Sequence, residues 1–104
     1  MSSRSKVRIT VMRRFVLSEV FTKSPVTPVE PLDACQVYVD GQEFTVDERG
    51  RMPEGFCTSA WNAIFPAVRT LSFGGNPPWY KEKGVAVECC TDGLRPVIFK
   101  LERI

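Results

Sequence analysis

The sequence predicts a small α+β domain in which a mostly antiparallel sheet packs on one main helix. Three observations lead to this fold class. The length of 104 residues suits one domain, so we expect residues 1–104 to fold as a single unit. Segments near both ends of the chain alternate apolar and polar side chains, as half-buried strands do. Between them, one stretch repeats its apolar residues at the spacing of a helix.

The N-terminal third is predicted to contain a strand, a short helix and a loop. Residues 7–12 alternate in hydropathy, which indicates a strand. Apolar residues recur at helical spacing within residues 15–22, so a short helix is expected there. The prolines of residues 24–33 exclude regular structure. We expect this stretch to form an extended surface loop rather than a linker between domains.

A hairpin is predicted next, around an Asp-Gly pair at positions 40–41. A type I′ turn needs a positive φ angle at both central residues, and Asp-Gly suits that requirement. Residues 36–39 and 42–46 are therefore expected to pair as two strands, with Phe44 and Val46 turned toward the core.

The main helix is predicted to begin near Ala60, with Thr58 or Ser59 as its N-cap, because either hydroxyl can accept a hydrogen bond from a first-turn N–H. Apolar residues from position 61 to 71 recur every three or four positions and give one apolar face. Pro66 lies within this pattern, so we expect it to kink the helix or to split it in two.

The helix is expected to end at the glycine pair 74–75, with one glycine in the left-handed conformation. Residues 76–80 are too rich in proline for a helix or a central strand. Two final strands are predicted at 85–90 and 97–103, joined by a turn at 91–94. Every second side chain of the last strand is apolar, so one of its faces should pack on the core.

The composition excludes several classes of function. The chain has no histidine, which excludes Ser-His-Asp and Cys-His catalysis and metal sites built on histidine. Its net charge of +2 is too small to indicate a nucleic-acid or membrane partner. No apolar run approaches the roughly 20 residues that cross a bilayer, and the chain begins with polar residues, so a cytoplasmic protein is expected. In a reducing cytoplasm the cysteines are expected to be thiols or metal ligands rather than disulfides.

The first candidates for a site are the four cysteines, as ligands of a thiolate-bound metal ion: Cys35, Cys57, Cys89 and Cys90. Their spacing forms none of the paired knuckles of a structural zinc site. Cys89 and Cys90 are adjacent in a predicted strand, so at most one of them lines a given pocket. One arrangement left open joins Cys35, Cys57 and one of that pair with a carboxylate or water. The other interpretation is that the cysteines are small buried core residues.

Cys57 is the candidate catalytic residue. It lies just before the predicted start of the main helix, where the helix dipole and free N–H groups stabilise a thiolate. No histidine can serve as its base, although Glu54 is close in the sequence. The alternative interpretation is that Cys57 packs beneath the helix that carries Trp61.

Three further residues are candidate ligand-binding residues: Trp79, Asn76 and Arg95. Trp79 and Asn76 belong to a loop whose paired glycines and prolines suit the wall of an apolar pocket. The alternative is a purely structural loop, with Asn76 at the helix end. Arg95 can hold a ligand carboxylate with both arms of its guanidinium, and the alternative is a salt bridge with Asp92 that holds the start of the last strand.

The second half of the chain carries a specific string of motifs, namely Gly55-Phe-Cys57, Trp61, Phe73-Gly-Gly-Asn-Pro-Pro-Trp79 and Cys89-Cys-Thr-Asp-Gly-Leu-Arg-Pro-Val-Ile-Phe-Lys100, followed by Glu102-Arg103. With this string, nearly the whole chain resembles a family of small, uncharacterised proteins of about this length that is widespread in bacteria and archaea. Two features depart from the family pattern. The stretch 24–33 differs in length and composition, and Gln36 stands where members commonly have a proline. The resemblance implies a shared fold and no particular activity.

These observations favour a small cytoplasmic module that binds a small molecule or a metal ion in a cysteine-containing pocket, together with Trp79 and Arg95. A thiol-based enzyme with Cys57 as its reactive thiol is one alternative. A structural or oligomerisation domain with core cysteines is another. A chain of this length leaves much apolar surface uncovered, so a homodimer is a reasonable expectation.

Overall fold

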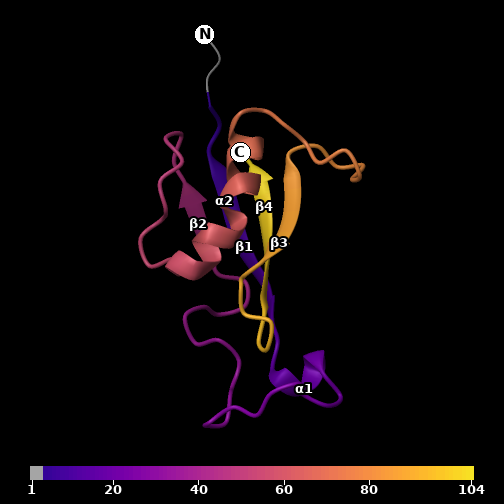
Figure 1. Cartoon of the computed structure of the whole chain (residues 1–104). Helices are drawn as coiled ribbons and strands as arrows, with labels where there is room; N and C mark the ends of the chain where they lie inside the picture. The colour runs from indigo at the N-terminus through magenta and orange to yellow at the C-terminus, as the bar shows by residue number, and fades with distance from the viewer. Residues whose placement is uncertain (1–3) are drawn as a thin grey trace.

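The computed structural model describes residues 4–104 and shows one antiparallel sheet with a helix across one face (Figure 1). In chain order the elements are β1 (Val7–Arg14), α1 (Leu17–Val20), β2 (Glu43–Val46), α2 (Thr58–Ser72), β3 (Val85–Cys89) and β4 (Val97–Arg103). The strands are ordered β2-β1-β4-β3 in the sheet, and each neighbouring pair is antiparallel. The predicted α+β fold class is confirmed.

The core lies between α2 and the face of the sheet that the helix covers. The fully or almost fully buried side chains there are Val7, Ile9 and Val11 from β1, Val97, Phe99 and Leu101 from β4, and Ala60, Ile64, Val68 and Leu71 from α2. Burial of one such large apolar side chain contributes ~1.5–3 kcal/mol, so this layer holds helix and sheet together. The alternation predicted for the first and last strands is confirmed. From β2, Val46 is buried and Phe44 packs against the core, as predicted.

The predicted hairpin is wrong in its first strand. Residues 36–39 form no strand, and β2 pairs with β1 instead. A turn is present, because the N–H of Gln42 donates to the carbonyl of Val39 at 3.1 Å, but the predicted type I′ geometry is wrong: Gly41 has a positive φ angle of 85° and Asp40 does not. The N–H of Gly41 donates to the carbonyl of Val11 at 2.7 Å. β1 thus supplies the backbone partners that a local hairpin would have used. The segment before the turn is left irregular, and Tyr38 packs into the core.

The main helix begins earlier than predicted and is not split. Its N-cap is Cys57 rather than Thr58 or Ser59, and no side chain makes a capping hydrogen bond there. α2 continues through Pro66 to its end. The proline removes the helical partner of the Asn62 carbonyl, but both residues are exposed, so water can satisfy that carbonyl.

α2 ends at the glycine pair, as predicted. Gly74 has a φ angle of 89°, and its N–H donates to the carbonyl of Leu71 at 3.0 Å. The N–H of Gly75 donates to the carbonyl of Thr70 at 2.8 Å. These two bonds form a Schellman motif, which satisfies carbonyls that the helix itself leaves without partners.

The segment between β1 and β2 is mostly irregular. It contains α1, within the predicted range 15–22, and it has neither helix nor strand in residues 24–33, as predicted. Figure 1 shows α1 and the loop after it beyond the lower end of the sheet, from which the chain returns toward β2.

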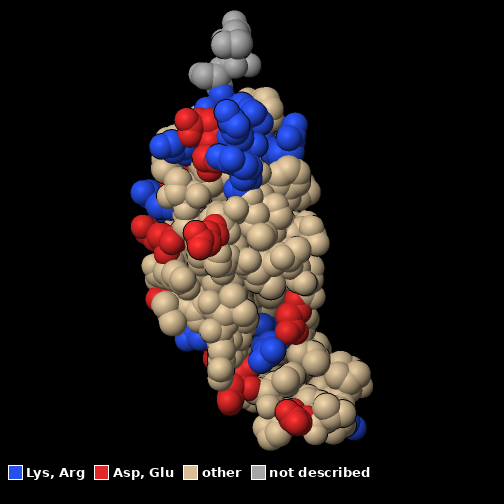
Figure 2. Space-filling model, turned by 90° about the vertical axis from the view of Figure 1, so that its left-hand side faces the viewer, with Lys and Arg blue, Asp and Glu red and all other residues tan. Residues whose placement is uncertain are grey.

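Charged side chains are unevenly spread on the side of the molecule that Figure 2 shows. Lys and Arg gather at its upper end, and uncharged side chains cover most of its middle. Within residues 4–104, no helix is long and apolar enough to cross a membrane.

Candidate functional site

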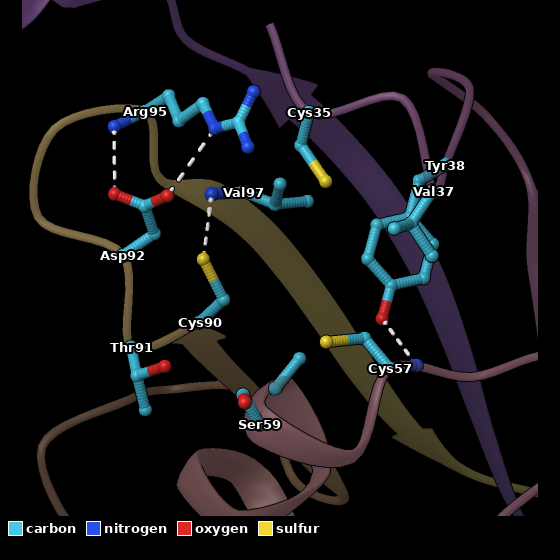
Figure 3. Close-up of a pocket in the computed structure, with 11 residues that line it drawn as sticks. Cys35, Val37, Tyr38, Cys57, Ser59, Cys90, Thr91, Asp92, Arg95 and Val97 are labelled. Carbon is cyan, nitrogen blue, oxygen red and sulfur yellow. Dashed lines mark hydrogen bonds and ion pairs between the residues drawn. The ribbon is translucent and has the colours of Figure 1, made fainter. Parts of the chain in front are cut away.

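A pocket of about 270 Å³ lies where the N-terminus of α2 meets the end of β3 and the loop that precedes β2. Three of the four cysteines line it, namely Cys35 from the loop, Cys57 from the helix N-cap and Cys90 from the position after β3. The other lining residues are Val37, Tyr38, Ser59, Ala60, Thr91, Asp92, Arg95 and Val97. Figure 3 shows the sulfur atoms of Cys35 and Cys57 directed into the space between these segments.

A hydrogen bond joins Cys57 and Tyr38 in the wall of the pocket. The backbone N–H of Cys57 donates to the phenolic oxygen of Tyr38 at 3.0 Å. The Tyr38 ring packs edge-on against Phe44 and Phe99, with centroids 5.8 and 5.3 Å away. The rigidly packed phenol therefore fixes the position of Cys57, and its own O–H proton remains available to a ligand.

The protonation state of Tyr38 follows from its surroundings. Burial raises the pKa of Tyr38 to about 12. The backbone N–H of Cys57 opposes this shift, whereas negative charge on the thiols of Cys57, Cys35 and Cys90 adds to it. The phenol is therefore neutral near pH 7. It acts as a hydrogen-bond donor and not as a base.

Cys89 and Cys90 lie on opposite sides of the sheet, as strand alternation predicts. The N–H of Cys90 donates to the carbonyl of Val97 at 3.1 Å, and the N–H of Val97 donates to Cys90 Sγ at 3.3 Å. These bonds hold the Cys90 sulfur at the side of the pocket formed by β4. Cys89 pairs with Ile98 and is exposed outside the pocket. All four cysteines are free thiols.

Cys35 is positioned by Arg14 at the end of β1. The Arg14 guanidinium donates to the carbonyl of Cys35 at 2.9 Å and pairs with Asp40 at 3.1 Å. A strand of the sheet therefore anchors this otherwise irregular loop. The hydrogen bond to its carbonyl holds the backbone of Cys35 in place, and the Cys35 thiol lines the pocket.

Asp92 and Arg95 form the rim of the pocket in the turn between β3 and β4. The Asp92 carboxylate accepts hydrogen bonds from the N–H of Leu94 at 2.9 Å and of Arg95 at 3.2 Å, and Arg95 Nε lies 3.3 Å from it. Partial burial opposes ionisation, but these donors together hold the pKa of Asp92 below its usual range. Arg95 Nη1 donates to the carbonyl of Asp33 at 3.2 Å. The predicted ion pair is present, and Arg95 Nη2 has no partner among residues 4–104.

The described residues contain no preformed cluster of metal ligands. Among residues 4–104, no group of three or more Cys, Asp or Glu side chains is placed to hold an ion. The structure brings Cys35, Cys57 and Cys90 to one pocket and leaves Cys89 outside it.

Trp79 and Asn76 lie apart from the cysteines, beside the C-terminal half of α2. Both line a separate groove of about 300 Å³, at which Trp79 is 76% exposed. The side-chain oxygen of Asn76 accepts hydrogen bonds from the N–H of Gly84 at 2.6 Å and from the Arg103 guanidinium at 2.8 Å. Asn76 thus fastens its loop to the sheet. The structure separates both residues from the pocket that contains Arg95.

Sequence reasoning missed two residues, Tyr38 and Arg103. Tyr38 had a weak signal, because a tyrosine close to a cysteine in an alternating segment is a natural place for a buried ring with a bonded hydroxyl. Arg103 had no local signal. Its guanidinium bonds residues 27 to 32 positions earlier in the chain, a separation that no local pattern reveals.

Comparison with protein-family models, with curated proteins and with solved structures finds no match for this chain. What the pocket can bind therefore depends on its own side chains. It offers three thiols, a phenolic donor, a guanidinium and the first-turn N–H groups of α2, which no side chain caps. This set suits a compact ligand that combines a negative charge with a soft or apolar part.

Proposed function

We propose that this domain is a small binding module that holds a compact, negatively charged ligand against the thiols of Cys35, Cys57 and Cys90. The observation that carries the proposal is the convergence of these three thiols, from three separate segments, on one pocket. Each of the three cysteines is partly exposed rather than fully buried, so a ligand can reach the sulfur atoms.

The negative group of the ligand is expected at the N-terminus of α2. The uncapped N–H groups of the first turn and the helix dipole both favour an anion there. Arg95 adds a positive group at the rim, where its side chain is 34% exposed. A carboxylate of a small organic molecule suits both partners, and its remaining part would contact the thiols and Val97.

A metal ion is the second candidate ligand, because three thiolates suit a soft ion such as Zn²⁺. Within residues 4–104 the required ligands are not brought together as the chain stands. Metal binding would therefore need the pocket residues to rearrange, which makes the organic ligand the favoured choice.

A thiol-based enzyme is the alternative in which Cys57 reacts with the ligand. Its N-cap position favours a thiolate. However, the chain has no histidine, Tyr38 keeps its proton near pH 7, and Asp92 is already paired with Arg95. The pocket therefore lacks a suitable base for activating the thiol, and binding is favoured over catalysis.

Native mass spectrometry of protein purified without oxygen or chelator tests the proposal. We expect an adduct above the mass of the chain that is lost in Cys57→Ala and weakened in Arg95→Gln. Cys89→Ala, on the other side of the sheet, is the matched control and should retain the adduct. The mass of the adduct separates an organic ligand from a metal ion.

Alkylation by iodoacetamide supplies the second measurement. A bound ligand should protect the three pocket thiols, whereas Cys89 should react freely. A bare chain mass, together with pocket thiols that react uniformly and slowly in the wild-type protein, would contradict binding and catalysis and leave the cysteines as core residues.

A further inference from the structure

We propose that the groove beside Trp79 binds an organic ammonium ion, either a free amine or the side chain of a lysine. This site is separate from the cysteine pocket, and the proposal does not depend on the function proposed for that pocket. The groove of about 300 Å³ is formed by α2, β3 and the loop between them. Glu88 is the one ionisable residue that lines it.

Glu88 is a carboxylate on the side of β3 that faces α2. It pairs across the sheet with Phe99 of β4, which is fully buried, so both side chains leave the same face. None of the six ion pairs formed within residues 4–104 includes Glu88. Glu88 is partly buried beside apolar side chains, and a cationic ligand in the groove would give it a charge-assisted hydrogen bond.

Trp79 supplies an aromatic surface at the same groove. Its side chain is 76% exposed, with the Tyr80 ring 5.9 Å away at an angle of 72°. The face of an indole attracts cations, so Trp79 and Glu88 favour the same kind of ligand. Pro77 and Pro78 restrict the backbone before the indole, and the bonds of Asn76 fasten the loop, so the rim is already formed without ligand.

The rest of the groove suits an aliphatic stem. Ala67, Leu71 and Ala86 are among its lining residues and present only apolar side chains. A stem packed on them would place a terminal ammonium near Glu88 and Trp79. A neutral ligand would fill the same space but would leave Glu88 without a counter-ion.

The opposite side of β3 provides an internal comparison. A second groove there is lined by Tyr80, Val85 and Val87, with Glu82 and Lys100. It also combines an acid with an aromatic ring, but its lining includes a basic residue as well. The groove with Glu88 therefore differs in having an acid and no basic residue in its lining.

Glu88 has one other reasonable role. An inward-facing charge on an edge strand discourages that strand from pairing with another chain. That role needs neither a groove nor an exposed indole. It predicts that Glu88→Gln aggregates and that the wild-type protein binds no amine.

Titration with n-pentylammonium chloride, followed by the indole N–H signals in ¹H–¹⁵N NMR, tests the site. The chain has two tryptophans, and Trp79→Phe identifies the signal of Trp79. We expect this signal to shift and saturate with a dissociation constant in roughly the millimolar range. The uncharged 1-pentanol, which has the same stem, should bind about tenfold more weakly or worse.

Two matched variants sharpen the test. Glu88→Gln should weaken binding of pentylammonium about tenfold or more, whereas Glu82→Gln, in the opposite groove, should leave it unchanged. N-acetyl-lysine methylamide separates the two sources of the ammonium: affinity equal to that of pentylammonium assigns a lysine side chain, and weaker binding assigns a free amine.

Three results would overturn the proposal. They are equal binding of pentanol and pentylammonium, unchanged affinity in Glu88→Gln, and no shift of the Trp79 signal beyond that caused by sodium chloride at the same ionic strength. Aggregation of Glu88→Gln, with no amine binding by the wild-type protein, would instead support the edge-protecting role.

Discussion

The two ends of α2 differ in whether other parts of the protein bond the backbone groups that the helix leaves unpaired. At the C-terminal end, the carbonyl of Leu71 accepts a bond from the Arg103 guanidinium at 3.1 Å, and the carbonyl of Ser72 accepts one from the N–H of Ser5 at 2.8 Å. At the N-terminal end, Cys57 makes no side-chain capping bond, and a pocket opens beside the first turn. The protein closes one end with its own groups and leaves the other end open to a ligand.

Two arginines show what this difference teaches. Arg103 donates to the carbonyls of Leu71 and Gly75 at 3.1 and 2.7 Å and to the carboxamide of Asn76 at 2.8 Å. Both of its Nη atoms therefore form hydrogen bonds within the fold. Arg95 pairs with Asp92 in its own turn and bonds the carbonyl of Asp33, but its Nη2 has no partner among residues 4–104. Arg103 thus stabilises the fold at the closed end of α2, whereas Arg95 is available to bind a ligand at the open end.

Replacing Arg103 by methionine should have the largest effect, because it opens the closed end. Three oxygen atoms lose a charged donor. The oxygens of Leu71 and Asn76 each keep an N–H donor, whereas the Gly75 carbonyl keeps none within residues 4–104, and a partly buried acceptor without a partner costs ~1–3 kcal/mol. We expect the free energy of unfolding in urea to fall by about 3 kcal/mol.

Arg8→Met is the matched control for that variant. Arg8 forms an ion pair with Glu102 at 3.4 Å, with its side chain 39% exposed, and its loss should cost less than about 1 kcal/mol. Equal losses of unfolding free energy in the two variants would show that the hydrogen bonds at the C-terminal end of α2 stabilise the fold no more than an exposed ion pair does.

Tyr38→Phe should have a smaller effect, because it acts at the open end. The variant keeps the ring packing and removes the acceptor of the Cys57 N–H. We expect a loss of about 1 kcal/mol in urea unfolding, since water in the pocket can replace the phenol. A loss as large as that of Arg103→Met would contradict the view that this end of the helix is open.

The sheet and helix could be predicted because their signals are local. The alternation in β1 and β4 and the helical spacing in α2 are readable from neighbouring residues, and each is present in the structure. The pocket depends on contacts between distant segments. Residues 36–39 are irregular because β2 occupies the edge of β1, and this places Cys35 beside Cys57. No local pattern carries that information.

Gly74→Ala should have an effect of about the same size as Tyr38→Phe, and it tests the closed end through its backbone alone. A Cβ at Gly74 would have no atom within 4 Å, so the cost comes from the positive φ angle of 89°. We expect a loss of about 1 kcal/mol, measured as a lower melting temperature. Gly93→Ala, which also has free space but no positive φ angle, is the control and should melt at nearly the wild-type temperature.

Asp92→Asn should show the smallest effect, which is present at neutral pH and fades in acid, and it tests how the open end is built. The folded protein holds the pKa of Asp92 below the ordinary aspartate value of 3.8. A carboxyl group with a lowered pKa contributes stability above its unfolded pKa and loses it as the pH falls through the lowered value. The stability advantage of wild type over Asp92→Asn should therefore be constant above about pH 5 and shrink as the pH falls through the lowered pKa of Asp92. An advantage that stays flat over this range would mean that Asp92 does not hold Arg95 in solution, and the whole guanidinium would then be available to the ligand at the uncapped end of α2.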